Sequence, residues 1–195
     1  MKKRGAVTAR TFLADNQLLL LFLALLLIGV VCGSYLYGDT AIASPIRPIK
    51  ASVLPMLRAL GESVLLPGML LVLLFLAGLT AYGAPIPLLV PLFFGLGIGL
   101  TQGYYYAMGI AGVGLSCLFI LPRGLITAVG LLMACAESWR MSLRLGRQLM
   151  PGGAMGSMWP SFRLYSIRFL LFLAIVLAAS VVDVALRTVF SFWLT

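Results

Sequence analysis

The stretch that decides the fold is residues 94–114, which reads FGLGIGLTQGYYYAMGIAGVG. Seven of its twenty-one residues are glycine, although the stretch is strongly apolar. In a water-soluble helix each interior glycine costs about 1 kcal/mol relative to alanine, so this many glycines would dissolve a helix in water. The stretch is therefore typical of a different environment.

The composition of the chain indicates which environment this is. Of the 195 residues, 62% are hydrophobic and 10% are charged, and the mean hydropathy is +1.11. No soluble domain of this size could bury so much apolar surface. Windows of about twenty apolar residues are long enough to cross a hydrocarbon core roughly 30 Å thick. We therefore predict an all-α polytopic integral membrane protein, forming a single membrane domain over residues 1–195.

The apolar windows predict five transmembrane helices and one short embedded or re-entrant segment. Pro67 lies near the start of the second span, where its missing N–H is tolerated. The predicted spans are residues 17–37, 64–84, 88–108, 124–143 and 169–190, the embedded segment is 110–121, the outside loop is 38–63, and the basic cytoplasmic segments are 1–16 and 144–168.

Residues 110–136 form an apolar run that is too long for one ordinary span. The run is interrupted by Leu121-Pro122-Arg123-Gly124. Two structures fit this pattern: a short segment that dips into the membrane before a span starting near Gly124, or one helix broken at Pro122 and Gly124. Both give the same number of crossings.

The distribution of lysine and arginine predicts the orientation. With a cytoplasmic amino terminus, nine of the fourteen basic residues lie inside and five lie outside. This bias predicts an inside amino terminus and an outside carboxyl terminus. Basic loops that follow this rule and contact anionic lipid of the bilayer explain most of the net charge of +9, so no nucleic-acid partner is expected. The alternative for the first span, a signal peptide cleaved near residues 41–43, would place the cleavage site about a dozen residues past the apolar core.

The sequence lacks the ingredients of the common catalytic and metal sites. It contains no histidine and only five acidic residues, no two of which are close in sequence. It also lacks a phosphate-binding Gly-x-x-x-x-Gly-Lys loop. We therefore expect no enzymatic activity, no metal and no cofactor. Cys32, Cys117 and Cys135 lie in apolar segments, and we expect them to be reduced packing thiols.

Charged residues within the spans are candidate functional residues. Asp183 and Arg187 are four residues apart in the last span, so they can pair on one helix face. Arg123 follows Pro122, and it must either reach to the outer interface or face the bundle interior and bond carbonyls that the proline leaves free. An ion or substrate pathway is the third interpretation of Arg123.

The glycines form two stripes, one in each of two predicted spans. Gly95, Gly99 and Gly103 recur every four residues, and Gly29 and Gly33 repeat this spacing in the first span. Small residues at this spacing allow close contact between helix backbones. We predict that both stripes pack helices of the chain itself; the alternatives are docking of partner helices and a homo-oligomer.

The order of these features resembles the stage II sporulation protein M family over nearly the whole chain. The likeness depends on five stretches: Leu27-Ile-Gly-Val-Val-Cys-Gly33, Gly78-Leu-Thr-Ala-Tyr-Gly-Ala-Pro85, Phe94-Gly-Leu-Gly-Ile-Gly99 with Gly103, Leu121-Pro-Arg-Gly124, and Arg140-Met-Ser-Leu-Arg-Leu-Gly-Arg147. Where the family commonly has histidine or glutamine after Leu-Pro, this chain has Arg123.

The resemblance implies a non-enzymatic role in engulfment during endospore formation. Such a protein would assemble with stage II sporulation proteins D and P, which cleave peptidoglycan, and would localise them at the septal and engulfing part of the cell (cytoplasmic) membrane. The alternative is a transporter or permease membrane subunit with a broken-helix site near Arg123.

Overall fold

The computed structural model describes residues 17–37, 53–83, 85–149 and 159–193. All five helices that it contains are long and apolar enough to cross a membrane, and no strand occurs among the described residues. The prediction of an all-α, multi-pass membrane protein with five spans is confirmed. The helices are α2 (Gln17–Leu36), α3 (Val53–Gly78), α4 (Ile86–Ala107), α5 (Ile110–Leu149) and α6 (Trp159–Trp193).

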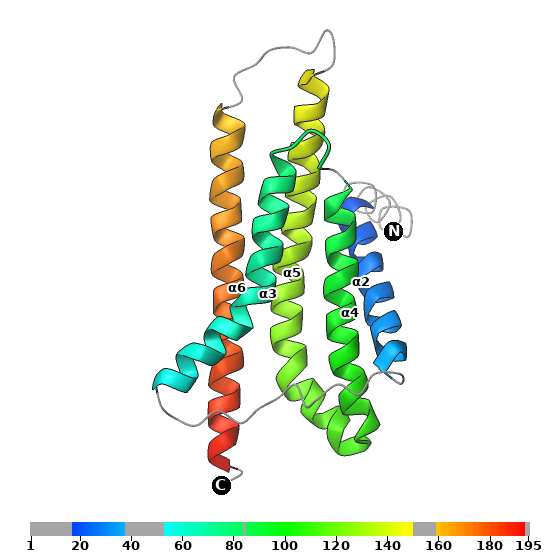
Figure 1. The fold of residues 1–195 in the computed structure, drawn as a ribbon, viewed down its shortest axis with the longest axis vertical. Coiled ribbons are helices and arrows are strands. Elements are labelled where there is room, and N and C mark those ends of the chain that lie inside the picture. Colours follow the sequence, from blue (N-terminus) through cyan, green and yellow to red (C-terminus); the bar gives the residue numbers. More distant parts are fainter. Residues whose placement is uncertain (1–16, 38–52, 84, 150–158, 194–195) are drawn as a thin grey trace, which may run out of the picture.

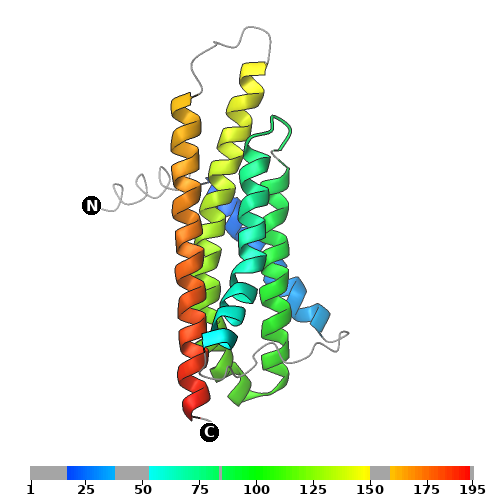
Figure 2. The same cartoon turned by 60° about the vertical axis from the view of Figure 1, so that its left-hand side comes forward.

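The helices run alternately up and down along one axis (Figure 1). Helices α2, α4 and α6 start at the end of the bundle where α3 and α5 finish. Helix α5 contacts each of the other four helices, whereas α2 packs mainly on α4 and α3 packs mainly on α5 and α6. Figure 2 shows α2 running obliquely behind α3 and α4. Helix α5 therefore joins an α2–α4 pair to an α3–α6 pair.

Large apolar side chains from several helices are fully buried in the bundle. Phe22, Leu74, Leu131 and Val176, from four different helices, are at most 1% exposed. Many large apolar side chains on the outside of the same helices are exposed instead. A bundle with an apolar exterior is stable only when lipid covers that exterior, which agrees with five membrane spans.

The carboxyl end of α3 is held by hydroxyl groups from the neighbouring helices. The Ser138 hydroxyl donates to the Leu74 carbonyl over 2.7 Å, and the Tyr165 hydroxyl donates to the Phe75 carbonyl, in the last turn, over 3.1 Å. The Ser142 hydroxyl donates to the Thr80 carbonyl over 2.8 Å, just beyond the helix end. Carbonyls at a helix end need such partners in an apolar environment. The spacing of Ser138 and Ser142 by four residues is the sequence signal for this contact.

Helix α3 begins much earlier than the predicted span of residues 64–84. It starts at Val53, so part of the predicted outside loop is helical and Pro67 lies in the helix interior. Figure 1 shows that the first turns of α3 lie obliquely to the rest and project from the bundle. A proline bends a helix because it removes one backbone hydrogen bond, and here the bend allows a single helix to contain both the projecting first segment and the span.

Helix α5 differs from both predicted alternatives. It runs from Ile110 to Leu149 without interruption, and Pro122 and Gly124 lie inside it. The predicted embedded segment 110–121 and the predicted span 124–143 are thus parts of one helix, and no helix break occurs at Pro122. A proline inside a membrane helix is tolerated when its surroundings satisfy the freed backbone groups. Figure 1 shows that the first turns of α5 run obliquely before the helix joins the bundle.

Of the other helices, α4 matches its predicted span closely, whereas α6 begins ten residues before the predicted 169–190. Helix α4 matches the predicted span 88–108 within two residues. Helix α6 starts at Trp159 and ends at Trp193, so the end of the predicted cytoplasmic loop is helical. Between α4 and α5, Gly109 has a φ of 77°, a backbone conformation that suits glycine. Residues 1–16, the candidate cleavage site at 41–43 and the centre of the basic loop at 150–158 lie outside the described residues.

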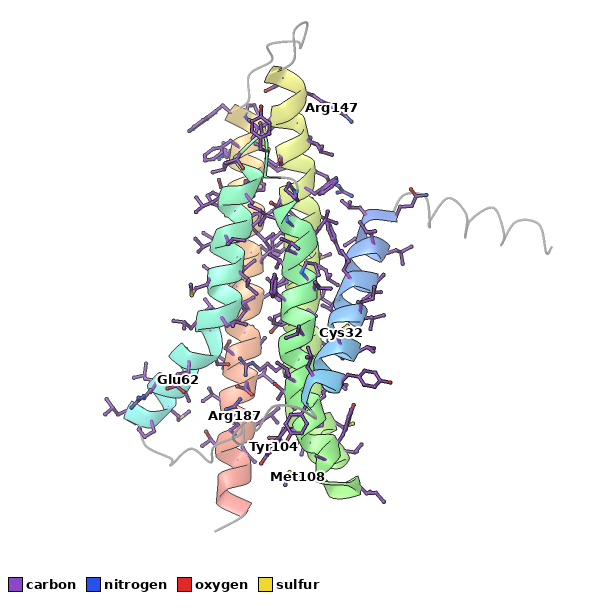
Figure 3. All side chains as sticks on the ribbon, turned by 45° about the vertical axis from the view of Figure 1, so that its right-hand side comes forward. Cys32, Glu62, Tyr104, Met108, Arg147 and Arg187 are labelled. Atoms are coloured by element: carbon purple, nitrogen blue, oxygen red, sulfur yellow. The ribbon has the colours of Figure 1, made fainter. Side chains whose placement is uncertain are left out.

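The orientation of the bundle gives a testable prediction. Figure 3 shows Arg147 at one end and Arg187, Glu62, Tyr104 and Met108 toward the other. Because the basic residues are concentrated toward the first end, we expect that end to be cytoplasmic. Alkaline phosphatase fused to the carboxyl terminus should therefore be active, and a green fluorescent protein fusion there should be dark. An inactive phosphatase together with a fluorescent fusion would reverse the orientation.

Candidate functional site

The charged residues predicted to lie within the membrane meet in one cluster. The Asp183 carboxylate accepts from the Arg187 Nε over 3.1 Å and forms an ion pair of 3.1 Å with Arg123. It also accepts from the Ser63 hydroxyl over 3.1 Å. The cluster therefore ties α3, α5 and α6 together through a single carboxylate.

The backbone at Ser63 explains why Arg123 binds there. In a regular helix the Ser63 carbonyl would accept from the backbone N–H of residue 67, but residue 67 is proline and has no N–H. The Arg123 guanidinium donates to this carbonyl over 2.9 Å. One arginine thus satisfies a carbonyl on α3 and a carboxylate on α6 at the same time.

The three charged side chains differ in burial. The Asp183 side chain is 3% exposed, whereas the side chains of Arg123 and Arg187 are 28% and 19% exposed. A partly open cavity of about 330 Å³ lies beside them, lined by residues of α3, α4, α5 and α6, including all three charged side chains. Gly124 also lines this cavity, so its lack of a side chain leaves space there.

The structure bears on two predictions about these charges. The predicted pairing of Asp183 with Arg187 is confirmed. Of the alternatives for Arg123, the observed one is an interior side chain that bonds a carbonyl freed by proline, although the proline is Pro67 on α3 and not the neighbouring Pro122. Sequence reasoning missed Ser63, for which the only signal was its position four residues before Pro67.

The glycine stripes bring α2 and α4 into backbone contact. A Cβ atom added to any of Gly29, Gly33, Gly95 or Gly99 would overlap a backbone carbonyl oxygen of the other helix. At Gly103 it would lie 2.6 Å from the Tyr37 Cβ. The hydroxyl of Ser34 on α2 also donates to the carbonyl of Gly99 over 3.3 Å. These contacts agree with packing within the chain, and all five glycines are buried.

No known family model, curated protein or solved structure matches this chain.

Within the described part of the chain, the cysteines and the acidic residues Glu62 and Glu137 add no second site. The three cysteines are free, and Cys135 is buried as expected, but Cys32 and Cys117 are exposed on the outside of the bundle and do not pack in it. Glu137 contacts Arg168 over 2.6 Å, and Glu62 pairs with Arg58 over 3.3 Å. Within the described ranges no three His, Cys, Asp or Glu residues gather as metal ligands.

The arrangement limits what the cluster can do. Each oxygen of Asp183 already accepts from a neighbour, so the carboxylate is poorly placed to act as a base. Arginine side chains remain charged and are not nucleophiles. The contacts of the cluster hold helices together, and its two arginines can attract an anion.

Proposed function

We propose that this chain is a non-enzymatic scaffold in the cell membrane that assembles and localises peptidoglycan-degrading partners at the septal and engulfing membrane during endospore formation. The partners would be stage II sporulation proteins D and P. The proposal is supported by the resemblance in glycine and proline patterns, and by a charged cluster whose contacts tie helices together.

One structural observation carries the proposal further, namely the oblique first segment of α3, which begins at Val53 and lies on the predicted outside. The side chains of Leu54 and Leu57 are 82% and 63% exposed, and Arg58 pairs with Glu62 on the surface of the same segment. An exposed face that mixes apolar and charged groups is a suitable contact for an extracytoplasmic partner. A partner that cleaves peptidoglycan must work on this side of the membrane.

The proposal predicts which proteins co-purify with this chain. We expect peptidoglycan hydrolases to be enriched when the tagged protein is extracted in a mild detergent from its native cells as they enter starvation. Mass spectrometry of the extract tests this. The double substitution Leu54→Ser with Leu57→Ser should lower hydrolase recovery severalfold, since both side chains lie on the projecting segment.

Tyr82→Ser is the matched control, because Tyr82 is 93% exposed but lies in the turn after α3, at the opposite end of the bundle. It should leave hydrolase recovery unchanged. If no extract contained hydrolases at any stage, the scaffold proposal would be contradicted. If the double variant recovered as much hydrolase as the wild type, the projecting segment of α3 would not be the contact surface.

A permease subunit is the second candidate, and the cavity beside Arg123 is the observation that favours it. Arg123→Ala should abolish solute movement in a permease but should spare partner binding in a scaffold that docks through α3. Recovery of a nucleotide-hydrolysing subunit or a solute-binding protein during growth, without hydrolases, would favour the permease.

A further inference from the structure

The cluster at Asp183 carries an unbalanced positive charge. Two guanidinium groups surround one carboxylate, and among the residues that the structure describes no other charged side chain lines the cavity. The Asp183 carboxylate is buried, whereas the guanidinium groups of Arg123 and Arg187 are partly exposed. Unpaired positive charge in an apolar environment is costly unless an anion completes it.

The arginines also keep donors that their contacts do not use. Arg123 donates once to Asp183 and once to the Ser63 carbonyl. A guanidinium has more N–H groups than these two, and its planar arrangement matches the oxygens of a phosphate. Both oxygens of the Asp183 carboxylate already accept hydrogen bonds. The remaining N–H groups of Arg123 are therefore available to a ligand in the cavity.

The rest of the cavity is mostly apolar. Its walls include Leu66, Phe94, Ile98 and Ile120, and the hydroxyls of Thr101 and Thr127 are the uncharged polar groups among its lining side chains. A site with cations at one place and apolar walls elsewhere suits an amphipathic anion. A free inorganic anion would use only the charged part.

The depth of the cluster agrees with this chemistry. The helix between Arg168 and Arg187 rises by about 28 Å, which is close to the hydrocarbon thickness of roughly 30 Å. Arg168 belongs to the charged group with Glu137 at the other end. The residues Tyr104–Tyr106 follow Thr101 on α4 by about one turn, and tyrosines are enriched at membrane interfaces. The cluster therefore lies near the headgroups of one leaflet, the outer one in the predicted orientation.

We infer that the cavity between α3, α4, α5 and α6 binds one phosphate-type anion, held by Arg123 and Arg187, with apolar walls that accommodate a lipid chain. The site does not depend on the proposed scaffold function, because it is built from different residues. An anionic phospholipid and free phosphate share the chemistry that the arginines recognise, and the test separates these sources.

The test measures ligand-dependent stabilisation of the purified, delipidated full chain in a neutral detergent. Thermal unfolding is followed as phosphatidylglycerol, phosphatidylcholine or inorganic phosphate is added. Phosphatidylglycerol should stabilise the chain at about tenfold lower concentration than phosphatidylcholine, since only the former leaves a net negative charge. Inorganic phosphate should have a much weaker effect, because it gains nothing from the apolar walls.

Two substitutions test the site in different ways. Arg123→Gln removes one cation and leaves Arg187 paired with Asp183. Gly97→Leu keeps every charge. Gly97 lines the cavity, and a Cβ at this position meets nothing within 4 Å, so the leucine side chain would fill the cavity. Each should weaken the phosphatidylglycerol effect by about tenfold or more. The controls are Arg147→Gln, an exposed cation at the other end, and Gly114→Leu, another helical glycine with nothing within 4 Å.

Each outcome decides the proposal. Loss of the phosphatidylglycerol effect in both test variants and in neither control supports it. If inorganic phosphate stabilises the chain as well as the lipid does and shows the same dependence on the variants, the site is supported and its ligand is free phosphate. Equal effects of the two lipids on the wild type, or a Gly97→Leu variant that responds like the wild type, would overturn it.

Discussion

Gly99→Leu is expected to prevent α2 from packing on α4 and so to unfold much of the bundle. A Cβ at position 99 would overlap the carbonyl oxygen of Val30 and lie 2.9 Å from the backbone nitrogen of Ser34. Backbone cannot move aside as a flexible side chain can, so the cost should exceed the roughly 1–3 kcal/mol that is typical of overpacking. The measurement is the fraction of monodisperse protein and its thermal unfolding midpoint in detergent.

Gly114→Leu is the control for the change from glycine to leucine in a membrane helix. Gly114 lies in α5, it is exposed, and a Cβ there meets no atom within 4 Å. This variant should unfold within a few degrees of the wild type. If Gly99→Leu behaved like Gly114→Leu, the backbone contact between α2 and α4 would be absent from the folded protein.

The glycine spacing shows how much of the fold the sequence could predict. A four-residue repeat predicts a helix face that approaches another backbone closely, and that face is the one observed. The repeat does not specify the partner helix, because the same face could meet another span or another molecule. The matching repeat at Gly29 and Gly33 was the available signal for α2.

The prolines show why the helix boundaries were harder to predict. Local rules treat a proline as a helix start or a helix break, and both Pro67 and Pro122 lie inside continuous helices. At Pro67 the freed carbonyl is satisfied by Arg123, which is sixty residues away from Ser63. No local rule contains that contact.

The candidate site was also predictable from the sequence only in part. The Asp183–Arg187 pair follows from a spacing of four residues on one helix. The addition of Arg123 and Ser63 depends on how α3, α5 and α6 are placed, which the sequence pattern does not give. The absence of histidine and the scarcity of acidic residues could indicate a lack of common catalytic groups, but they could not indicate that the few charges meet at one cavity.

Asp183→Asn is expected to be the most destabilising single change within the charged cluster. It would leave Arg123 and Arg187 without their shared carboxylate, although the side-chain volume hardly changes. Removing one partner of a buried ion pair costs about 3–5 kcal/mol, because the remaining charge is uncompensated. Arg123→Gln should cost less, since Asp183 keeps its ion pair of 3.0 Å with Arg187. Reversible denaturation in detergent, or steric trapping of the unfolded state in a bilayer, measures the free energy of unfolding.

A second substitution separates charge from packing. If uncompensated positive charge is the cause, Arg123→Gln introduced into the Asp183→Asn variant should recover part of the lost stability, because it removes one of the two unpaired cations. Ser180→Ala is the control on the same helix: Ser180 is buried, but its hydroxyl donates to Val176 of its own helix, and the change should cost about 0.6 kcal/mol. If Asp183→Asn also cost less than about 1 kcal/mol, the carboxylate would not be neutralising the two arginines, and their charge would have to be compensated from outside the chain.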